Sequence, residues 1–258
     1  MQTIFATAAG DPAHPNEDIV VGGPTFVIVL DGATAPPGIT SGCIHDVAWL
    51  VCHLAGHLGQ LLTTDANGDL RDQVADAITR LCADHADTCD LKNPASPSST
   101  LAVLRDRGDT VDTLVLSDSP IVLHQPSGIR PIIDDRPARL PSYKPEDVRG
   151  QRNQPGGFWV ASTEPQAAYE AIHEAIPAKD LRQAALLTDG AARLVERFGL
   201  TDWHGLLKLL DTAGPSELIR QVRAAERTIT PPPGSRGKQY DDATAVTADF
   251  ERLQTHGR

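Results

Sequence analysis

The sequence predicts an α+β fold in which antiparallel strands pack against helices. Residues 25–30 form an unbroken apolar run with β-branched side chains, which is typical of a buried strand. Residues 41–62 and 69–85 carry apolar side chains at helical spacing and predict two adjacent helices. Residues 100–124 contain three short apolar segments joined by short turns, and a meander of this kind is antiparallel.

The remaining elements are predicted from the same two patterns, helical spacing of apolar residues and the apolar or alternating pattern of strands. Residues 3–8 alternate weakly between apolar and polar and predict a first strand. Further strands are expected at 129–133, 158–161, 181–187 and 245–248. Further helices are expected at 166–176, 191–198, 203–210 and 217–225. Asp69 is a suitable N-cap for the helix that follows it. The polar, Pro-rich stretch 134–157 has no clear period, and it either covers a site or forms an ordinary long loop.

The composition favours a globular, acidic protein. The chain has 258 residues, enough for one large domain or two small ones, with 23 Lys and Arg against 34 Asp and Glu, a formal net charge of −11. This surplus of carboxylates disfavours nucleic acid as a partner and suits the binding of hard cations. The N-terminus has no secretory signal, and no apolar run is long enough to span a membrane. The sequence therefore predicts a cytoplasmic protein without a membrane partner.

The cysteines lie at positions 43, 52, 82 and 89, and none forms a CxxC pair. Without a secretory signal, free thiols are favoured over disulfides. Cys43 with His45, and Cys52 with His53, could supply zinc ligands, but they fall within the predicted helix 41–62 and lack the ligand spacing of a zinc site. The pattern therefore favours packing in the core.

Acidic residues lie at the ends of the predicted strands. Asp31 follows the apolar run directly, on what the sequence predicts to be a tight turn. Asp118 and Asp189 follow two other strands, and Asp241 precedes the last one. Any one of them is more typical of a turn or a helix cap. Gathered at one end of a sheet, however, the carboxylates would repel one another unless cations lay between them, and oxygen ligands suit Mg²⁺ or Mn²⁺.

These aspartates belong to five ordered motifs: Asn16-Glu17-Asp18, Val29-Leu30-Asp31-Gly32, Ser117-Asp118-Ser119, Leu187-Thr188-Asp189-Gly190 and Asp241-Asp242-Ala243-Thr244. In order, spacing and strand context they resemble the motifs of the metal-dependent serine/threonine protein phosphatases of type 2C. The segment 157–159 and the ending 238–244 look like an actinobacterial-type branch. The resemblance implies a four-layer α-β-β-α sandwich, with two antiparallel β-sheets flanked by helices, in a single domain over residues 1–258.

The resemblance also implies a binuclear Mn²⁺ or Mg²⁺ site. Asp31 would bridge both ions, and the Gly32 carbonyl would bind one of them. Asp189 and Asp241 would complete the coordination of the other. These residues carry the expected activity, which is the hydrolysis of phosphoserine or phosphothreonine on proteins or of a small phosphorylated molecule. We expect the protein to be a monomer.

Three further acidic residues have expected roles in the same site. Glu17 and Asp18 would hold metal-bound waters, and Asp118 would bind a third, weaker ion. In this mechanism the two cations share a water and lower its pKa, and the resulting hydroxide attacks phosphorus in line with the departing seryl or threonyl oxygen. Asp31 and Asp189 are the acidic residues expected to act in catalysis, without a covalent enzyme intermediate.

The sequence departs from the family at two functional positions. Ala13 replaces an Arg that usually grips the substrate phosphate, and Ala33 replaces a His thought to protonate the leaving group. His14 is the candidate for that acid, with His45 as an alternative. Candidates for the phosphate grip are Arg136, Arg139 and Arg152, unless they lie in a solvated loop.

A third departure is Ser117, which replaces the Gly usual before the third-motif aspartate. Because Ala13 and Ala33 replace the usual Arg and His, an alternative function stays open. The chain could be a catalytically weak or inactive pseudophosphatase that binds metal or a phosphorylated partner as a regulatory module.

Overall fold

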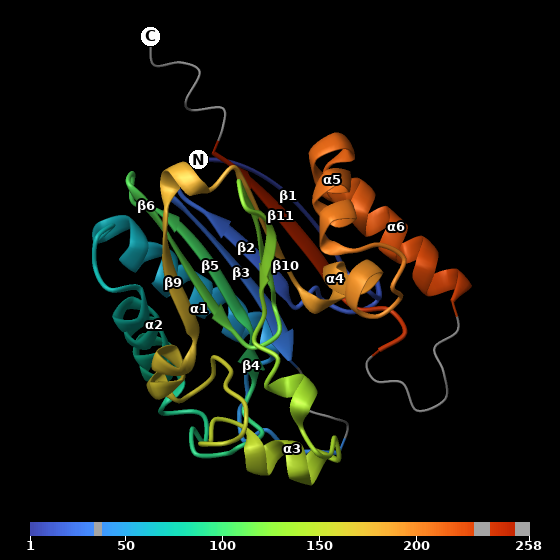
Figure 1. Cartoon of the computed structure of the whole chain (residues 1–258). Coiled ribbons are helices and arrows are strands. Elements are labelled where there is room, and N and C mark those ends of the chain that lie inside the picture. Colours follow the sequence, from blue (N-terminus) through green and yellow to red (C-terminus); the bar gives the residue numbers. More distant parts are fainter. Residues whose placement is uncertain (34–37, 230–237, 251–258) are drawn as a thin grey trace.

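Two antiparallel sheets packed face to face form the centre of the computed structural model, which describes residues 1–33, 38–229 and 238–250. Helices cover the outer face of each sheet, so that the layers run α-β-β-α (Figure 1). Every pairing between named strands is antiparallel. The predicted fold class is therefore confirmed.

The first sheet has the strand order β1-β11-β10-β7-β8. Its strands are β1 (Gln2–Ala8), β7 (Ile121–Gln125), β8 (Gly128–Ile132), β10 (Gln183–Leu187) and β11 (Ala243–Asp249). The second sheet has the order β2-β3-β5-β6-β9, with a short strand β4 paired to β3. Its strands are β2 (Asp18–Gly22), β3 (Phe26–Ala33), β4 (Ser98–Ser99), β5 (Leu101–Asp106), β6 (Thr110–Leu116) and β9 (Ile172–Pro177).

The helices divide into two groups. Helices α1 (Val47–Thr64) and α2 (Leu70–His85) pack on the second sheet, whereas α4 (Asp189–Glu196), α5 (Trp203–Ala213) and α6 (Pro215–Thr228) pack on the first. The segment between β8 and β9 contains α3 (Pro145–Gln151) and two 3₁₀ helices, Pro137–Arg139 and Pro165–Glu170. A third 3₁₀ helix, Ala178–Asp180, joins β9 to β10.

The apolar run in β3 is continuous because the strand is buried on both faces. Val27 and Val29 belong to the core between the two sheets. Ile28 and Leu30 belong to the core beneath α1 and α2. Alternate side chains of a strand point to opposite faces, so a strand in the middle of a four-layer sandwich needs apolar residues at every position. This burial fixes the register of β3 and hence the position of Asp31 at its end.

The predicted helix 41–62 was wrong at its start, because helix α1 begins at Val47. Asp46 is the N-cap, and its side chain accepts a hydrogen bond of 2.8 Å from the Trp49 backbone N–H. Cys43 therefore lies in a loop before the helix, and Cys52 is exposed. Core packing, which the sequence favoured for both cysteines, does not account for either of them.

Three other predicted elements differ from the structure. Residues 166–176 form a short 3₁₀ helix and then the edge strand β9. Residues 158–161 make only isolated bridges, through Phe158 and Ala161, and do not form a strand. The three strands of the predicted meander are divided between sheets, because β5 pairs with β6 whereas β7 pairs with β8 and β10. Strand β2 was not predicted.

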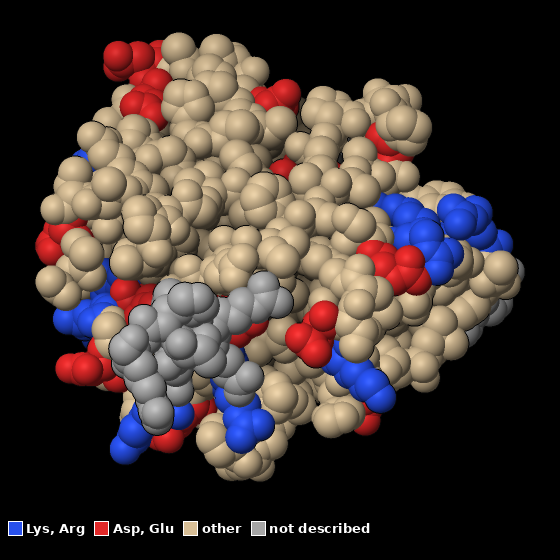
Figure 2. All heavy atoms as spheres, turned by 90° about the horizontal axis from the view of Figure 1, so that it is seen from above, with Lys and Arg blue, Asp and Glu red and all other residues tan. Residues whose placement is uncertain are grey.

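On one end of the molecule, charged side chains lie in small groups (Figure 2). Figure 2 shows the end of the molecule at which β1 begins, where acidic and basic side chains are interspersed among other residues. Of the helices that the structure describes, none has both the length and the apolar character needed to cross a membrane.

Candidate metal centre

Asp18 and Asp31 lie opposite each other on the neighbouring strands β2 and β3. Directly paired residues of antiparallel strands point to the same face, so the two carboxylates are neighbours. Asp31 is not on a tight turn as predicted, because β3 continues through Gly32 to Ala33 and pairs there with β4. A Cβ atom on Gly32 would lie 2.3 Å from Val47 Cγ1. The close approach of α1 therefore requires glycine beside the first acidic pair.

Asp189 reaches the pair from the other sheet, where it opens helix α4 instead of a turn. Its backbone N–H donates a hydrogen bond of 3.3 Å to Asp31 Oδ2. Thr188, the residue before it, donates from Oγ1 to Asp18 Oδ2 at 3.0 Å and accepts from the Thr244 backbone N–H at 2.9 Å. Thr188 was not predicted as a site residue, although it stands in the fourth motif. It links the ends of both sheets.

Asp241 is positioned by two cations. The Arg193 guanidinium lies 2.8 Å from its Oδ2, and Lys238 Nζ lies 3.4 Å from its Oδ1. Arg193 is 4% exposed and also pairs with the buried Glu226 at 2.6 Å. Arg193 was not predicted as a site residue. Its spacing of four residues from Asp189 places both on one face of α4, but nothing local in the sequence indicates its partner on the far segment.

The next residue, Asp242, holds the first motif in place. Its carboxylate accepts hydrogen bonds from the backbone N–H groups of Gly10 at 2.8 Å and Glu17 at 2.6 Å. A Cβ atom on Gly190 would lie 1.9 Å from the Asp242 carbonyl oxygen, so the glycine of the fourth motif permits this contact. The paired aspartates of the fifth motif therefore differ in their contacts. Asp241 pairs with cations, whereas Asp242 ties the loop before β2 to the start of β11.

Asp118 follows β6 at the point where the chain crosses to the other sheet. Ser117 precedes it with a φ of 68°, in the left-handed region that favours glycine. The Ser117 hydroxyl donates to Asp118 Oδ1 at 3.0 Å, and the Ser117 backbone N–H donates to Asp134 Oδ2 at 3.0 Å. The serine thus keeps the backbone conformation that a glycine would adopt and adds a hydrogen bond to the acidic residue.

The carboxylates form one electrostatic cluster. Burial, together with the charges of Asp18, Asp189, Asp118 and Asp241, raises the pKa of Asp31 well above its ordinary value. Burial is also the main cause that raises the pKa of Asp18 to about 7 and that of Asp189 to about 7. The ionised form of each group is disfavoured chiefly because burial removes its hydration, and the neighbouring carboxylates add repulsion.

Glu196 extends the cluster along α4. Desolvation, followed by the charges of Asp118 and Asp189, raises the pKa of this carboxyl to about 7, although the side chain is exposed at the surface. Glu196 was not predicted as a site residue, because a glutamate near the end of a helix carries no local signal of a site.

The cluster fits a pair of hard divalent cations. Asp18 is 7% exposed, and its Oδ1 is buried without a hydrogen bond among the described residues. A buried carboxylate oxygen without a partner is costly, and a cation or its bound water would satisfy it. The donor set consists of carboxylate and carbonyl oxygens, which Mn²⁺ and Mg²⁺ prefer.

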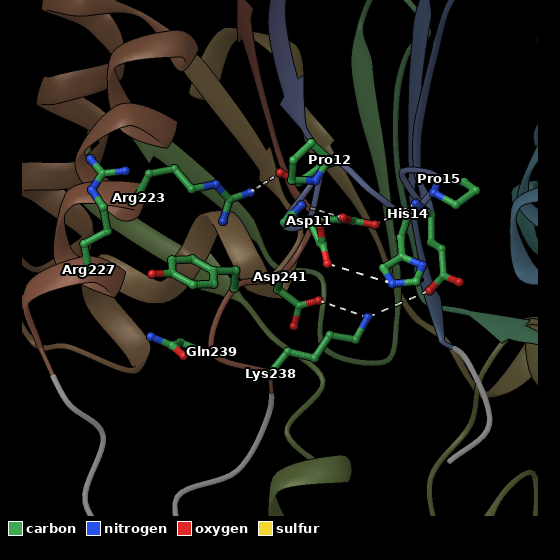
Figure 3. A pocket seen from close by; sticks show the side chains of 14 residues that line it. Asp11, Pro12, His14, Pro15, Arg223, Arg227, Lys238, Gln239 and Asp241 are labelled. Carbon is green, nitrogen blue, oxygen red and sulfur yellow. Dashed lines mark hydrogen bonds and ion pairs between the residues drawn. The ribbon is translucent and has the colours of Figure 1, made fainter. Parts of the chain in front are cut away.

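A pocket of about 950 Å³ opens beside Asp241 (Figure 3). His14 lines it with a side chain that is 77% exposed and 3.8 Å from Asp11. The basic residues of the pocket are Arg223, Arg227 and Lys238. Lys238 extends toward Asp241 in this view, and its Nζ lies 3.4 Å from Asp241 Oδ1 and 3.9 Å from Glu17 Oε2.

The other predicted histidine and the predicted arginines have different surroundings. His45 stacks on Trp49, with ring centroids 3.9 Å apart. The three arginines contact other protein groups: Arg136 binds Asp134, Arg139 binds Asp135, and Arg152 binds the Ser96 carbonyl and the Ser162 hydroxyl.

A family model described as protein phosphatase 2C matches residues 14–223. The chain belongs to the protein phosphatase 2C family. This confirms the predicted resemblance and with it the predicted class of enzyme, a protein phosphatase. No curated protein matches the sequence significantly. The individual roles of Glu17, Asp18 and the other site residues stay predictions.

Solved structures of phosphatases share the fold. The Mycobacterium tuberculosis serine/threonine phosphatase PstP/Ppp has 18% identity and a TM-score of 0.60, with 96% of this chain and 97% of that chain covered. Stp1 from Staphylococcus aureus has 14% identity and a TM-score of 0.63, with 96% and 94% covered. The catalytic domain of PstP in complex with two manganese ions has 17% identity and a TM-score of 0.60, with 96% and 97% covered.

The raised pKa values predict how the stability of this phosphatase 2C chain depends on pH. Carboxyls such as Asp18 and Asp189 titrate near pH 4 when unfolded and at about 7 in the fold. Between these values the folded state binds more protons, so stability falls as the pH rises through this window. In chelator, the thermal midpoint is expected to be lower at pH 8 than at pH 5.5, and Mn²⁺ should reverse the difference. Asp18→Asn should reduce this difference in thermal midpoint. An unchanged pH dependence in that variant would show that the buried Asp18 carboxyl does not cause it.

Proposed function

We propose that this protein phosphatase 2C member hydrolyses phosphoserine or phosphothreonine at a pair of Mn²⁺ or Mg²⁺ ions bound by the acidic cluster. The observation that carries the proposal is the meeting of Asp18, Asp31, Asp118, Asp189 and Asp241 at one end of the sandwich, in one electrostatic cluster. The manganese complex of PstP supports the choice of metal, because that phosphatase has the same fold.

Each ligand has a separate proposed role. Asp31 would contribute to holding both ions, the Gly32 carbonyl to holding one of them, and Asp189 and Asp241 to holding the other. Asp31 is suited to this shared role because it is fully surrounded by acidic charge, with Asp18, Asp189, Asp118 and Asp241 all raising its pKa. When bound, the ions lower the pKa of the attacking water and neutralise charge on the phosphoryl oxygens.

The outer acidic residues orient water. Glu17 and Asp18 would hold water at the metal site, and their positions are set by the Asp242 and Thr188 hydrogen bonds. Asp118 would contribute to a third, weaker cation site. Removal of a hydrogen bond that positions a metal ligand usually changes metal affinity or activity by about 10–100-fold.

Lys238 is the proposed phosphate contact that replaces the missing arginine at Ala13. Its ammonium lies 3.4 Å from Asp241 and 3.9 Å from Glu17, so it stands beside the metal ligands and over the pocket. Its side chain is 60% exposed and can turn toward a bound phosphate. Arg227 lines the same pocket, away from Lys238, and adds positive charge there for substrate residues next to the phosphorylated one.

Lys238→Ala is expected to raise KM for a phosphopeptide about 10-fold and to change kcat less, because a charge-assisted hydrogen bond contributes about 1.5–3 kcal/mol and exposure reduces this. Initial rates over a range of phosphopeptide concentration measure the effect. Lys92→Ala, at an exposed lysine outside the pocket, is the matched control. An unchanged KM for Lys238→Ala would rule out the contact.

His14 is the proposed general acid. It lines the pocket that contains Asp241, and its exposed ring can approach a leaving oxygen. General acid catalysis matters most for alkyl leaving groups such as serine. His14→Ala should therefore lower the rate for phosphoserine peptides more than for p-nitrophenyl phosphate, and equal effects on both would remove the role.

The experiment that tests the function is hydrolysis of a phosphothreonine peptide and of p-nitrophenyl phosphate with Mn²⁺, with and without chelator. We expect activity that the chelator abolishes and that Asp189→Asn reduces strongly. Chelator-insensitive activity would contradict the two-metal mechanism. Metal binding without turnover of either substrate would instead establish the pseudophosphatase, for which the losses at Ala13 and Ala33 are the supporting observations.

The cellular setting is part of the proposal. We expect a cytoplasmic, monomeric protein with a single phosphatase domain over residues 1–258, a role in signalling and phosphorylated proteins as partners. The net charge of −11 supports the exclusion of nucleic acid.

A further inference from the structure

A second cluster of metal-ligating side chains lies at the ends of helices α1 and α2. Cys43 precedes α1, His85 is the last residue of α2, and Cys89 follows it. The ligand atoms of the three residues lie within 4.8 Å of one another. None of them lines the pocket beside Asp241. This cluster is therefore separate from the acidic site.

The protein backbone brings the two cysteines together. The Asp90 N–H donates to the Gly42 carbonyl at 2.8 Å, so the loop before α1 is bonded to the loop after α2. The Ile44 N–H donates to the Cys89 sulfur at 3.4 Å. A backbone N–H aimed at a cysteine sulfur favours the thiolate, which is the form that binds metals.

His85 contributes a buried imidazole with one nitrogen directed at a cysteine. The residue is 2% exposed, and its Nδ1 faces the Cys43 sulfur at 3.6 Å. In a neutral imidazole one nitrogen carries the proton and the other has a free lone pair. Its Nε2 makes no hydrogen bond among the described residues, so nothing there competes with a tautomer that offers the Nδ1 lone pair to a metal beside Cys43.

The spacing suits a tetrahedral zinc ion. With bonds of about 2.3 Å to sulfur and about 2.0 Å to nitrogen, tetrahedral geometry separates sulfur and nitrogen by about 3.6 Å and two sulfurs by about 3.8 Å. The Cys43–His85 distance already has this value. The two sulfurs are 2.7 Å apart, and a small rotation of one cysteine side chain would open this edge.

We propose that Cys43, His85 and Cys89 bind one zinc ion, which joins the start of α1 to the end of α2. Because both cysteines are only partly buried, solvent can reach the fourth position and a water completes the tetrahedron. Binding releases the thiol protons to solvent. Soft thiolate ligands select zinc here, whereas the carboxylates of the acidic cluster select Mn²⁺ or Mg²⁺.

A neighbouring trio provides a control. His53 Nδ1 and His57 Nε2 lie 3.0 Å and 2.6 Å from the same oxygen of Asp84, so these groups already satisfy one another. His57→Ala should leave zinc binding at the cysteine site unchanged. Cys52→Ser, at an exposed thiol on α1, is the matched control for loss of a sulfur.

Cobalt titration of the full-length, reduced protein tests the proposal. Bound Co²⁺ should produce thiolate-to-cobalt charge-transfer absorption that saturates at one equivalent, and one equivalent of Zn²⁺ should abolish it. Asp189→Asn should keep the absorption, since carboxylate ligands do not produce it. The wild-type titration is decisive even if a variant fails to fold.

The variants assign the ligands. Cys43→Ser and Cys89→Ser should each lose the charge-transfer absorption and the rise in thermal midpoint on zinc addition, whereas Cys52→Ser and His57→Ala should keep both. The proposal is overturned if the wild-type protein shows no such absorption, if the absorption survives both cysteine variants, or if a Cys43–Cys89 disulfide forms under reducing agent.

Discussion

Replacement of Asp31 by asparagine is expected to lower kcat/KM for phosphopeptides by about 10³-fold or more. Asp31 is the carboxylate whose pKa is raised by all four neighbouring aspartates, and it is the proposed ligand of both ions. A bound cation contributes several kcal/mol to transition-state stabilisation, and each 1.36 kcal/mol corresponds to a factor of ten in rate. Initial rates with saturating Mn²⁺ measure the loss.

The fold should survive this substitution. An asparagine oxygen can still accept the hydrogen bond that the Asp189 backbone N–H donates to Asp31. The far-ultraviolet circular dichroism of Asp31→Asn should therefore match the wild type. Asp211→Asn, at an exposed position on α5, should keep full activity. Activity in Asp31→Asn within 10-fold of the wild type would mean that the bridging assignment is incorrect.

Asp112→Ala is expected to destabilise the protein by about 3–5 kcal/mol, because it leaves a buried arginine charge without its counterion. Asp112 and Arg105 are register partners on β6 and β5, 2% and 1% exposed. Arg105 Nε lies 3.1 Å from the carboxylate, and its other nitrogens bond Gln73 and the Gly68 carbonyl. At about 2–4 °C per kcal/mol, the thermal midpoint should fall by about 6–20 °C.

Two controls separate burial from charge. Asp135→Ala breaks an exposed pair with Arg139, 51% and 73% exposed, and should leave the midpoint unchanged. The double variant Arg105→Met/Asp112→Leu removes both charges and should be more stable than Asp112→Ala. If Asp112→Ala melts within 2 °C of the wild type, the buried Arg105–Asp112 pair does not contribute the expected stability.

Local signals in the sequence identified the acidic residues that the structure brings near one another. Asp31 ends the apolar run of β3, Asp189 lies just beyond the apolar strand β10, and Asp69 caps α2 as expected. The contacts that position the ligands were not predictable in this way. Arg193 and Asp241 are 48 positions apart, and Asp242 bonds Glu17 across 225 positions. Hydrophobic periodicity describes one element at a time and contains no information on such pairs.

The errors in the fold have the same origin. Residues 172–177 have apolar side chains at helical spacing, yet pairing with β6 makes them the edge strand β9. The turn after β6 resembles the turn of a hairpin, but the chain crosses there to the other sheet, and packing between sheets decides this. Cys43 and Cys89 are close in space only because the ends of α1 and α2 meet.

The acidic cluster is proposed to bind a pair of cations, with Asp31 as a ligand of both. Equilibrium dialysis against Mn²⁺ at pH 7.5, with manganese counted per chain, tests it most directly. We expect two ions per wild-type chain at saturation and fewer than one in Asp31→Asn at the same free concentration, while Asp211→Asn binds two. A wild-type protein that binds no Mn²⁺, or an Asp31→Asn variant that still binds two ions, would contradict the account.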